Sequence, residues 1–472
     1  MGTPVEDILK RLGGPLSQAQ AEAIWARGKE AVVLALMQLS AQALGLGTSA
    51  ATGANAPPSS VPPYAKPPRR RRGKKPGAKR GHPGRRRVTR AEPTRHVKHP
   101  PLKRCPDCGG PVHKPARYRT RRIEDIPEVF PELTEHTIPR QWCPKCRREV
   151  EPVVDEAMPK AALGHGLVTL SAWLHYGLGV TISQVISVLS HHVHLELSQG
   201  GLVNAWQRLG EVLTPWYDQI GEEIKSSGVL HADETGWRVN GATWWLWCFA
   251  NGQTCYYLID RCRGSPALER FFVEAFDGVL VSDFWAAYHA VWAADRQCCL
   301  VHLLRELETV DQHNDSAEWK AFAKKLRRLI RDGIRLRKRE DFEPERYGSR
   351  IERIDQRLMA LAGGPYADAD AARLGKRLRK YCDSLFTFLD RPEVPFENNF
   401  AERMIRPAVV LRKNSQSNRS EKGAAVQAVL MSIYRTLQLR GHDPLQVIPE
   451  ALRAYLSTGT LPALPEPIVA DG

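Results

Sequence analysis

Residues 228–235 read Gly228-Val229-Leu230-His231-Ala232-Asp233-Glu234-Thr235, and they open the most regular part of the sequence. The apolar start leads into Asp233, and Asn-Gly pairs follow at 240–241 and 251–252. Asn-Gly accepts the positive φ angles of a type I′ turn, so two pairs predict an antiparallel meander with strands at 229–239, 243–250 and 254–260. Asp233 then lies on the first strand.

The residues after this meander predict a helix, a strand, a second helix and a last strand. Ser265 is expected as the N-cap of the first helix, with Pro266 at its first position and Asp277-Gly278 at its end. A short apolar strand, typical of parallel sheets, follows at 279–283, a helix at 285–292 and a strand at 297–301. The order β-β-β-α-β-α-β resembles the ribonuclease-H-like fold, in which the first and fourth strands are neighbours.

In this α/β fold Asp233 and Asp283 would lie side by side at strand ends. Paired carboxylates bind hard divalent cations. Two Mg²⁺ ions roughly 3.5–4 Å apart support in-line displacement at phosphorus. Either Asp taken alone is better explained as a strand-end cap that satisfies local backbone groups.

A third carboxylate occurs in Asn398-Asn399-Phe400-Ala401-Glu402-Arg403. One of the two asparagines can cap a helix, which places Glu402 in its first turns and Arg406 a turn later. Pro407 is expected to kink or end this helix near Arg406. The basic residues around Glu402 favour phosphate contacts, with a surface ion pair as the alternative.

The composition of the chain bounds its class. Its 472 residues include 68 Lys and Arg against 52 Asp and Glu, which gives a formal charge of +16. This excess favours a polyanionic partner or an acidic membrane surface. No run of eighteen apolar residues and no signal-peptide core occur, so we expect a soluble intracellular protein without a membrane segment.

The N-terminal part changes character along its length. Residues 1–47 predict a helix with a broad apolar face, suited to helical packing or to self-association. Residues 48–100 predict a basic, flexible linker, because Gly, Pro and small residues interrupt its charge. The charged residues at 69–87 are all basic, which favours contact with nucleic-acid phosphates over an inert linker. The predicted contacts are Arg69, Arg70, Arg71, Arg72, Lys74, Lys75, Arg85, Arg86 and Arg87.

Two Cys-Pro-x-Cys knuckles follow the linker, Cys105 with Cys108 and Cys143 with Cys146. Two such knuckles complete the tetrahedral sulfur site that Zn²⁺ prefers. We expect a zinc ribbon at 101–155 with its strands in 118–141, and four unrelated core cysteines are the alternative. Cys299 and His302 have no second ligand pair nearby, so packing or support of the active site is favoured over zinc binding.

Two further regions predict helices. Residues 156–226 show a break at Ser198-Gln199-Gly200-Gly201, with Trp206, Leu209, Leu213 and Trp216 as core positions, in a linker or DNA-binding domain. Residues 303–395 predict a helical insertion whose basic residues favour DNA contact over a solvated face. These basic residues are Lys324, Lys325, Arg327, Arg328, Arg331, Arg335, Arg337, Lys338 and Arg339.

The ordered set of motifs resembles the DDE transposases of the insertion sequence 66 family. The motifs are His231-Ala232-Asp233-Glu234-Thr235, Asp283 with Tyr288, Cys299-Leu300-Val301-His302, and Asn398-Asn399-Phe400-Ala401-Glu402-Arg403 with Arg412-Lys413-Asn414. The basic segment and the two knuckles resemble the N-terminal half of that family. The resemblance implies that Asp233, Asp283 and Glu402 are a catalytic triad that binds two Mg²⁺ ions, for which Mn²⁺ can substitute.

The resemblance also implies the partners of the chain. It implies structural Zn²⁺ on the four knuckle cysteines, and DNA contacts from Arg403, Arg406, Arg412 and Lys413. The DNA partners would be the terminal inverted repeats of an element and a target DNA. A homodimer or higher oligomer on DNA, companion proteins encoded by the element, and a cytoplasmic, nucleoid-associated location are further expectations.

We therefore expect a transposase that cleaves insertion-sequence ends with Mg²⁺ and transfers the strands into target DNA. The alternatives are a domesticated, non-catalytic DNA-binding protein and a ribonuclease-H-fold nuclease without strand transfer. The predicted organisation is a helical N-terminal segment (1–47), a basic linker (48–100), a zinc ribbon (101–155), a helical domain (156–226), the first part of a ribonuclease-H-like core (227–302), a helical insertion (303–395), the last helix region of the core (396–440) and a C-terminal tail (441–472).

Overall fold

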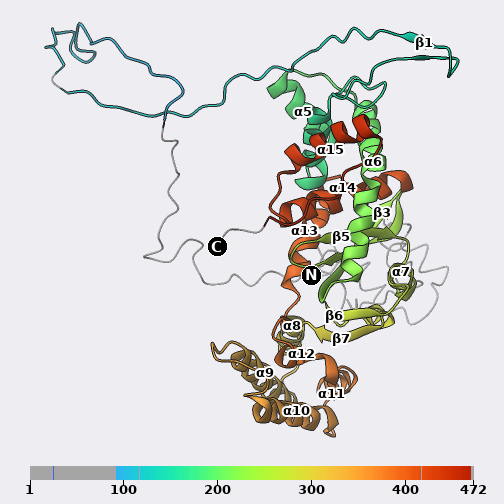
Figure 1. The fold of residues 1–472 in the computed structure, drawn as a ribbon. Helices are drawn as coiled ribbons and strands as arrows, with labels where there is room; N and C mark the ends of the chain where they lie inside the picture. The colour runs from blue at the N-terminus through green and yellow to red at the C-terminus, as the bar shows by residue number, and fades with distance from the viewer. Residues whose placement is uncertain (1–24, 26–91, 116, 416, 469–472) are drawn as a thin grey trace. The chain divides into compact units, whose positions relative to one another are not determined.

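Figure 1 shows a computed structural model of the protein, which describes residues 25, 92–115, 117–415 and 417–468. The predicted N-terminal helix, apart from Trp25, and the basic residues Arg69 to Arg87 lie outside the described residues, so both stay predictions. The chain divides into two compact units. Among the described residues, one unit contains 221–406, and the other contains 92–115, 117–220, 407–415 and 417–468.

The first unit is built on a mixed five-stranded sheet in the order β5-β4-β3-β6-β7. The strands are β3 (Val229–Val239), β4 (Ala242–Ala250), β5 (Cys255–Asp260), β6 (Phe276–Ser282) and β7 (Ala293–Cys298). The meander β3-β4-β5 is antiparallel, whereas β6 is parallel to both β3 and β7. The expected pairing of the first and fourth strands is confirmed, because Val229 lies opposite Val279.

The two Asn-Gly pairs behave differently. Asn240 and Gly241 have φ angles of 48° and 76°, as the type I′ turn requires. The second hairpin has no such two-residue turn, because β4 ends at residue 250 and β5 begins at 255. There the side-chain oxygen of Asn251 accepts hydrogen bonds from the amides of Gln253 and Thr254, at 2.9 and 2.8 Å. The asparagine therefore acts through its side chain, not through a positive φ angle.

Helix α7 (Ser265–Phe271) is shorter than predicted, and its cap is different. Gly264 is the N-cap, so Ser265 is already helical and its expected capping role was wrong. Gly278 does not end the helix either, because it lies inside β6. A Cβ atom at Gly278 would clash with the backbone oxygen of Ser227, so the residue permits close strand contact.

The boundaries of the next elements are shifted from their predicted positions. A single short 3₁₀ helix, η3 (Ala286–Ala290), replaces the helix expected at 285–292. Strand β7 ends at Cys298 and not at 301, since helix α8 already begins at Leu300. The apolar residues that predicted the end of a strand are instead the buried first turn of α8.

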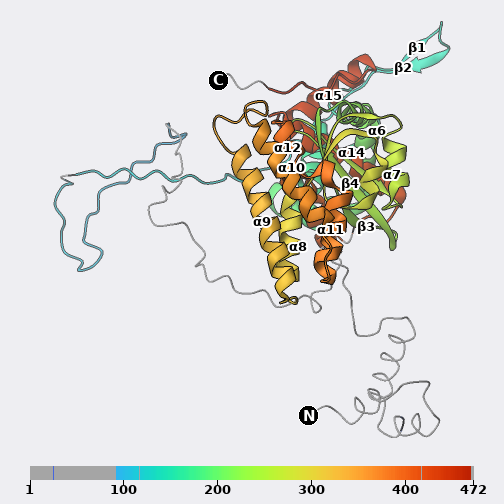
Figure 2. The same cartoon turned by 90° about the horizontal axis from the view of Figure 1, so that it is seen from below.

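Residues 300–390, called the helical region below, follow β7. The helical region contains α8 (Leu300–Val310), α9 (Ala317–Arg337), α10 (Gly348–Gly363), α11 (Ala369–Lys380), the short 3₁₀ helix η4 (Cys382–Ser384) and α12 (Thr387–Asp390). Figure 2 shows α8 to α11 packed beside one another. Their apolar faces share one core with Val279 and Val281 of β6. This shared core attaches the helical region to the sheet.

Helix α13 (Asn399–Ser415) continues through Pro407, so of the two outcomes expected near Arg406 the helix end was wrong, and the kink stays a prediction. Proline inside a helix removes one hydrogen bond and costs about 3 kcal/mol. The helix tolerates this cost because it buries one apolar face along its length. That face consists of Ala401, Ile405, Ala408 and Leu411, all at most 5% exposed.

The second unit is largely helical. It contains α4 (His165–Ala172), the π-helical turn η2 (Trp173–Gly177), α5 (Ile182–Val193), most of α6 (Gln199–Lys225), α14 (Glu421–Leu439) and α15 (Pro444–Thr458). The predicted core positions on α6 are buried, and the indole of Trp206 donates to the hydroxyl of Ser171 at 3.0 Å. The break precedes α6, at left-handed His194, because Gly200 and Gly201 are already helical.

The strands expected at 118–141 were wrong. Residues 117–140 contain no helix or strand, and Figure 1 draws them as an extended trace that leads into β1. The strands β1 (Gln141–Cys143) and β2 (Arg148–Val150) flank the second knuckle instead. Three prolines at 127, 131 and 139 lack amide donors, which explains why this segment pairs with no strand. None of the described helices combines the length and apolar character needed to cross a membrane.

Candidate active site

The three predicted carboxylates come from three elements of the first unit. Asp233 lies in the middle of β3, where its carboxylate accepts the amide of Glu234 at 2.9 Å. Asp283 directly follows β6 and accepts the amide of Trp285 at 2.8 Å. Glu402 lies in the first turn of α13, and its amide donates to the backbone oxygen of Asn398 at 3.2 Å. Strand pairing and a helix start therefore orient all three side chains.

These carboxylates influence one another. Burial raises the pKa of Asp233 well above its usual range, and the charges of Glu234, Asp283 and Glu402 raise it further. Burial also raises the pKa of Asp283, with a smaller contribution from Glu402. Carboxylates that repel one another in a partly desolvated site favour either protonation or a bound cation. The cluster therefore has the electrostatic character of a cation site.

A fourth carboxylate, Glu234, was not singled out from the sequence. Its side chain is only 3% exposed, and it accepts hydrogen bonds from the hydroxyl of Tyr288 at 2.6 Å and from Arg263 at 3.1 Å. Burial and Asp283 raise its pKa, while Tyr288 and Arg263 lower it. Glu234 is thus a buried acid whose two oxygens are already satisfied.

Arg263 is held rigidly beside the carboxylates. Its guanidinium lies between two indole rings, 4.0 Å from the ring centre of Trp285 and 4.4 Å from that of Trp245. The indole nitrogen of Trp285 donates to the backbone oxygen of Arg263 at 3.4 Å. The positive charge of Arg263 lowers the pKa of both Glu234 and Asp283. A fixed cation therefore offsets part of the repulsion among the acids.

Asn398 connects the segments that carry the three carboxylates. Its side-chain amide donates to the oxygen of Ala232 at 2.7 Å, and its side-chain oxygen lies 3.0 Å from Nδ1 of His231. Its backbone amide donates to Sγ of Cys299 at 3.2 Å. The amide of Cys299 in turn donates to the oxygen of Ser282 at 2.9 Å. One residue, 1% exposed, therefore links β3, the end of β6 and the start of α13.

His302 and Arg305 of α8 face Glu402. His302 Nε2 and Arg305 Nη1 lie 3.6 and 3.4 Å from the same carboxylate oxygen, Oε1. The Glu402 side chain is 32% exposed, so solvent reaches this end of the cluster. The preferred supporting role for Cys299 and His302 agrees with these contacts, since Cys299 accepts from Asn398 and His302 faces Glu402.

The predicted DNA contacts on α13 differ in exposure. Arg403 and Arg406 are exposed in the first unit, and the guanidinium of Arg403 lies 5.6 Å from the ring centre of Phe400. Arg412 and Lys413 belong to the second unit. Lys413 is exposed, whereas Arg412 is half-buried, and burial lowers its pKa.

The two cysteine knuckles are each formed as turns in the second unit. In the first, the amide of Cys105 donates to the oxygen of Gly110 at 2.8 Å, and Gly109 has a φ angle of 71°. In the second, the amide of Cys146 donates to Sγ of Cys143 at 3.4 Å. The amides of Cys108 and Cys146 lower the pKa of Cys105 and Cys143 respectively. These hydrogen bonds therefore favour the thiolate form of Cys105 and Cys143.

In neither candidate metal site do the side chains lie close enough together to coordinate one metal ion. Within the described part of the chain, no group of three His, Cys, Asp or Glu side chains is near enough to share one metal ion. The donor chemistry fits nevertheless, because carboxylate oxygens suit hard divalent cations and two thiolate pairs suit Zn²⁺. The fold brings the three carboxylates within electrostatic reach of one another. It does not bring the two knuckles together as a four-cysteine group.

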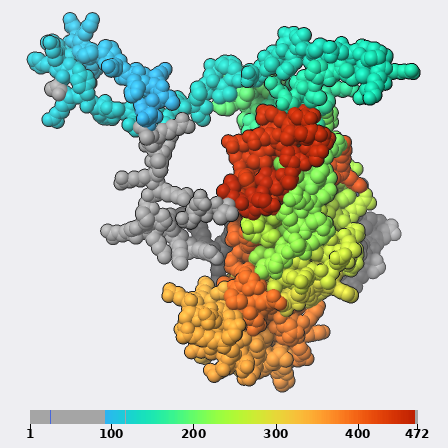
Figure 3. All heavy atoms as spheres, viewed as in Figure 1, coloured from blue at the N-terminus to red at the C-terminus, as the bar shows by residue number. Residues whose placement is uncertain are grey.

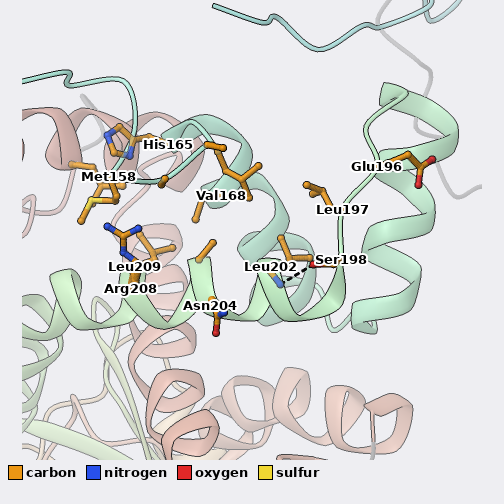
Figure 4. A pocket seen from close by; sticks show the side chains of 16 residues that line it. Met158, His165, Val168, Glu196, Leu197, Ser198, Leu202, Asn204, Arg208 and Leu209 are labelled. Atoms are coloured by element: carbon orange, nitrogen blue, oxygen red, sulfur yellow. Dashed lines mark hydrogen bonds between the residues drawn. The ribbon is translucent and has the colours of Figure 1, made fainter. Parts of the chain in front are cut away.

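A cavity of about 330 Å³ in the second unit contains none of these residues (Figure 4). Its lining is mainly apolar, including Val168, Leu202 and Leu209. Two of its polar side chains are already engaged. Arg208 donates to the oxygen of Pro159 at 2.6 Å, and Nε2 of His165 lies 3.1 Å from the oxygen of Asp155. The cavity therefore shares no residue with the candidate active site.

Sequence reasoning missed Glu234, Arg263 and the linking role of Asn398. The acidic pair Asp233-Glu234 was visible, but alternation along a strand normally sends adjacent side chains to opposite faces. Arg263 carries no local signal, since its role depends on two distant tryptophans. For Asn398 the sequence predicts only a role as a possible helix cap. Its bonds to β3 span more than 160 positions, which no local pattern encodes.

Comparison with known proteins identifies the family. Residues 160–426 match the model of the Transposase IS66 family, and residues 103–147 match the zinc-finger binding domain of transposase IS66. The uncharacterized protein y4jD of Sinorhizobium fredii is 23% identical over 409 residues, 76% of each chain. The uncharacterized protein y4hP is 23% identical over 382 residues, 72% of this chain and 68% of y4hP. A third, y4qI, is 24% identical over 293 residues, and the match spans only about half of each chain, 55% and 53%.

The larger family match covers more than half of the chain and includes all three predicted carboxylates. The smaller match includes both cysteine knuckles, and a zinc-finger domain fits a structural Zn²⁺ site. The motifs in the sequence and these two matches agree on one conclusion: the chain belongs to the IS66 family of transposases.

Proposed function

We propose that the chain is a DNA transposase in which Asp233, Asp283 and Glu402 are the catalytic carboxylates. The observation that carries the proposal is the convergence of their three segments, because β3 pairs with β6 and the side-chain amide of Asn398, at the start of α13, donates to the oxygen of Ala232 in β3 at 2.7 Å. Their elements are a central strand, the end of its parallel neighbour and a helix that follows the helical region. The strand order supports a ribonuclease-H-like core, with the helical region as an insertion and the domain boundaries as predicted from the sequence.

The three carboxylates would hold divalent cations, for which we propose Mg²⁺. Bound there, Mg²⁺ would supply charge stabilisation for in-line displacement at phosphorus. The Cys105, Cys108, Cys143 and Cys146 thiolates would hold a structural Zn²⁺. The DNA partners would be the element ends and the target, bound by an oligomer of the chain with companion proteins.

The chain's own side chains would orient this site. Arg263 would keep Glu234 and Asp283 ionised through its fixed positive charge. Asn398 would hold the start of α13, and hence Glu402, against β3. Exposed Arg403 and Arg406 would contact the DNA backbone near the reacting phosphate.

The reaction would have two displacements. In the first, water forms a bond to phosphorus, the bond to the 3′ oxygen breaks, and the departing 3′-hydroxyl gains the proton that water loses. In the second, that 3′-hydroxyl loses its proton and forms a bond to a target phosphorus, the bond from this phosphorus to a target 3′ oxygen breaks, and the departing target 3′-hydroxyl gains the proton. Both displacements use an oxygen nucleophile that the chain does not provide, so no covalent protein–DNA intermediate forms.

The test is the substitution Glu402→Gln. The matched control is Glu308→Gln, at an exposed position of α8. Cleavage and joining of DNA that carries the element ends should fall by more than about 10²-fold, beyond the range for residues that only support a metal ligand. DNA binding and the control should be unchanged.

Joining by the Glu402→Gln variant at the wild-type rate would overturn the proposal. Wild-type cleavage without any joined product would indicate the nuclease instead. DNA binding without Mg²⁺-dependent cleavage would indicate the non-catalytic binding protein.

A further inference from the structure

The helical region of the first unit contains a groove whose charge the candidate active site does not use. It lies between the C-terminal half of α9 and α10, with a cavity volume of about 410 Å³. Figure 3 shows the packed surface of the helical region, in orange at the bottom of the view. The lining, called the arginine groove below, consists of Asp332, Arg335, Leu336, Arg339, Arg350, Arg353, Ile354 and Arg357.

Five arginines and one aspartate give this groove a strong positive charge. The single acid, Asp332, accepts Arg357 at 2.9 Å and lies 4.0 Å from Arg328. Arg339 is paired outside the groove with Asp341, at 2.9 Å. Among the described residues, no ion pair is found for the other three arginines, Arg335, Arg350 and Arg353.

The apolar core keeps these charges close together. Leu329, Ile330 and Leu336 of α9 are buried in the same core as Ile351, Ile354 and Leu358 of α10. The helix backbones are therefore fixed, and the arginines cannot separate without loss of that packing. Like charges held in a concave surface raise the local concentration of anions.

The spacing of the arginines suits a repeating anion. Arg350, Arg353 and Arg357 recur at i, i+3 and i+7 along one face of α10. At 1.5 Å per residue this row spans about 10 Å. One DNA strand presents a phosphate about every 3.4 Å along the axis, so the row covers about three phosphate steps.

The groove has no means of reading bases. Its lining contains no aromatic, Asn or Gln side chain, so neither base stacking nor amide contacts to base edges are available. Guanidinium groups instead match phosphate oxygens through two parallel hydrogen bonds. The chemistry therefore selects the sugar–phosphate backbone and no particular sequence.

We propose that the arginine groove binds the phosphate backbone of duplex DNA, as a site separate from the three carboxylates. The inference deepens the proposed function and rests on it, because a transposase must hold DNA beyond the phosphate that reacts. It also changes which basic residues matter. Of those predicted from the sequence, Arg327 is engaged by Asp311 and Arg337 by the oxygen of Pro392, whereas Arg350, Arg353 and Arg357 were not predicted.

The experiment compares two triple variants of the full chain. One changes Arg335, Arg350 and Arg353 to Ala. The matched control changes Lys320, Lys376 and Lys380 to Ala, which removes the same charge from exposed positions of the helical region outside the groove. The probe is a labelled duplex of unrelated sequence, and anisotropy measures its binding between about 50 and 200 mM salt.

The groove variant should lose at least about tenfold in affinity at low salt, and its slope of log affinity against log salt should decrease by about two to three. The control should keep the wild-type slope, and an Arg→Lys version of the groove variant should recover most of it, because the charge is retained. Equal melting temperatures would show that the variants are folded.

Two results overturn the inference, and they are distinguishable from failure of the proposed function. An unchanged slope in the groove variant, or the same decrease in the control, contradicts the groove alone when the wild type still cleaves and joins DNA. Wild-type protein that binds no duplex DNA contradicts both the groove and the proposed function.

Discussion

The carboxylate cluster and the cysteine knuckles are both metal sites predicted from short motifs, and the fold treats them differently. Strand pairing and Asn398 connect the segments of Asp233, Asp283 and Glu402 before any cation is considered. Between the two knuckles, the described residues 117–140 contain no helix or strand. A packed sheet can hold acidic ligands in place, whereas a small thiolate domain obtains its packing from the metal.

Removal of zinc is expected to produce the largest difference between the two metal sites. Apparent binding free energies of structural zinc are about 10–16 kcal/mol, and they are also folding free energies. A chelator should therefore abolish amide protection in residues 103–147 and leave β3 and β6 protected. Hydrogen exchange of the full chain measures both segments, with chelation of Mg²⁺ alone as the control. If the knuckle amides remain protected from exchange without zinc, the knuckles do not depend on the metal for their packing.

Asn398→Ala should have the next largest effect, because it disconnects the carboxylate segments. It leaves the oxygen of Ala232 and Nδ1 of His231 buried without their partner, at a cost of about 1–3 kcal/mol for each unsatisfied group. The Mg²⁺ concentration for half-maximal cleavage should rise roughly tenfold or more, as for other residues that orient metal ligands.

The control for Asn398 is Asn399→Ala, because among the described residues the side chain of Asn399 bonds only to nearby Glu397. Thermal melting and Mg²⁺ titration of cleavage should be close to wild type in this control. Equal losses in both variants would indicate that the helix start, and not the connection to β3, matters.

Asp233→Asn should stabilise the metal-free protein while it abolishes cleavage. Burial and neighbouring carboxylates raise the pKa of Asp233, so its charged form destabilises the fold at neutral pH. Removal of the charge should add about 1 kcal/mol, or roughly 2–4 °C in melting temperature. Because a raised pKa means stability that is lost as pH rises, the difference from wild type should shrink as pH falls and Asp233 becomes protonated.

Exposed Asp277→Asn is the control for that measurement, with a change within about 0.5 kcal/mol at either pH. A metal-free Asp233→Asn protein less stable than wild type at neutral pH would show that the carboxylates are not held in mutual repulsion.

The smallest effect is expected at the hairpin of the second knuckle. Arg140 pairs with Glu151 at 2.9 Å across β1 and β2, but its side chain is 67% exposed. Exposed pairs contribute about 0–1 kcal/mol. Arg140→Ala should therefore leave hydrogen exchange of 141–150 unchanged in the presence of zinc. A large loss of protection would mean that surface ion pairs, and not the metal, hold this hairpin.

The fold could be predicted where local chemistry decides it. Asn240-Gly241 requires positive φ angles, and the apolar run at 279–282 suits a buried parallel strand, so the meander and the β3–β6 pairing were correct. Predictions failed where a long-range contact overrides a local preference. Gly278 resembled a helix stop, but it serves close packing against Ser227, and Pro407 resembled a helix end, but burial of one face outweighs its cost.

The amino-acid sequence by itself determined the family, the three acidic motifs and the cysteine pairs, because each depends on residue type at short spacing. Only the tertiary structure decided which groups surround them. Glu234 beside Tyr288, Arg263 between two tryptophans, and Asn398 across β3 and α13 join residues far apart in the chain. The arginine groove likewise needs two helices packed together before its separate arginines become one binding surface. Such proximity arises from packing, which sequence spacing does not encode.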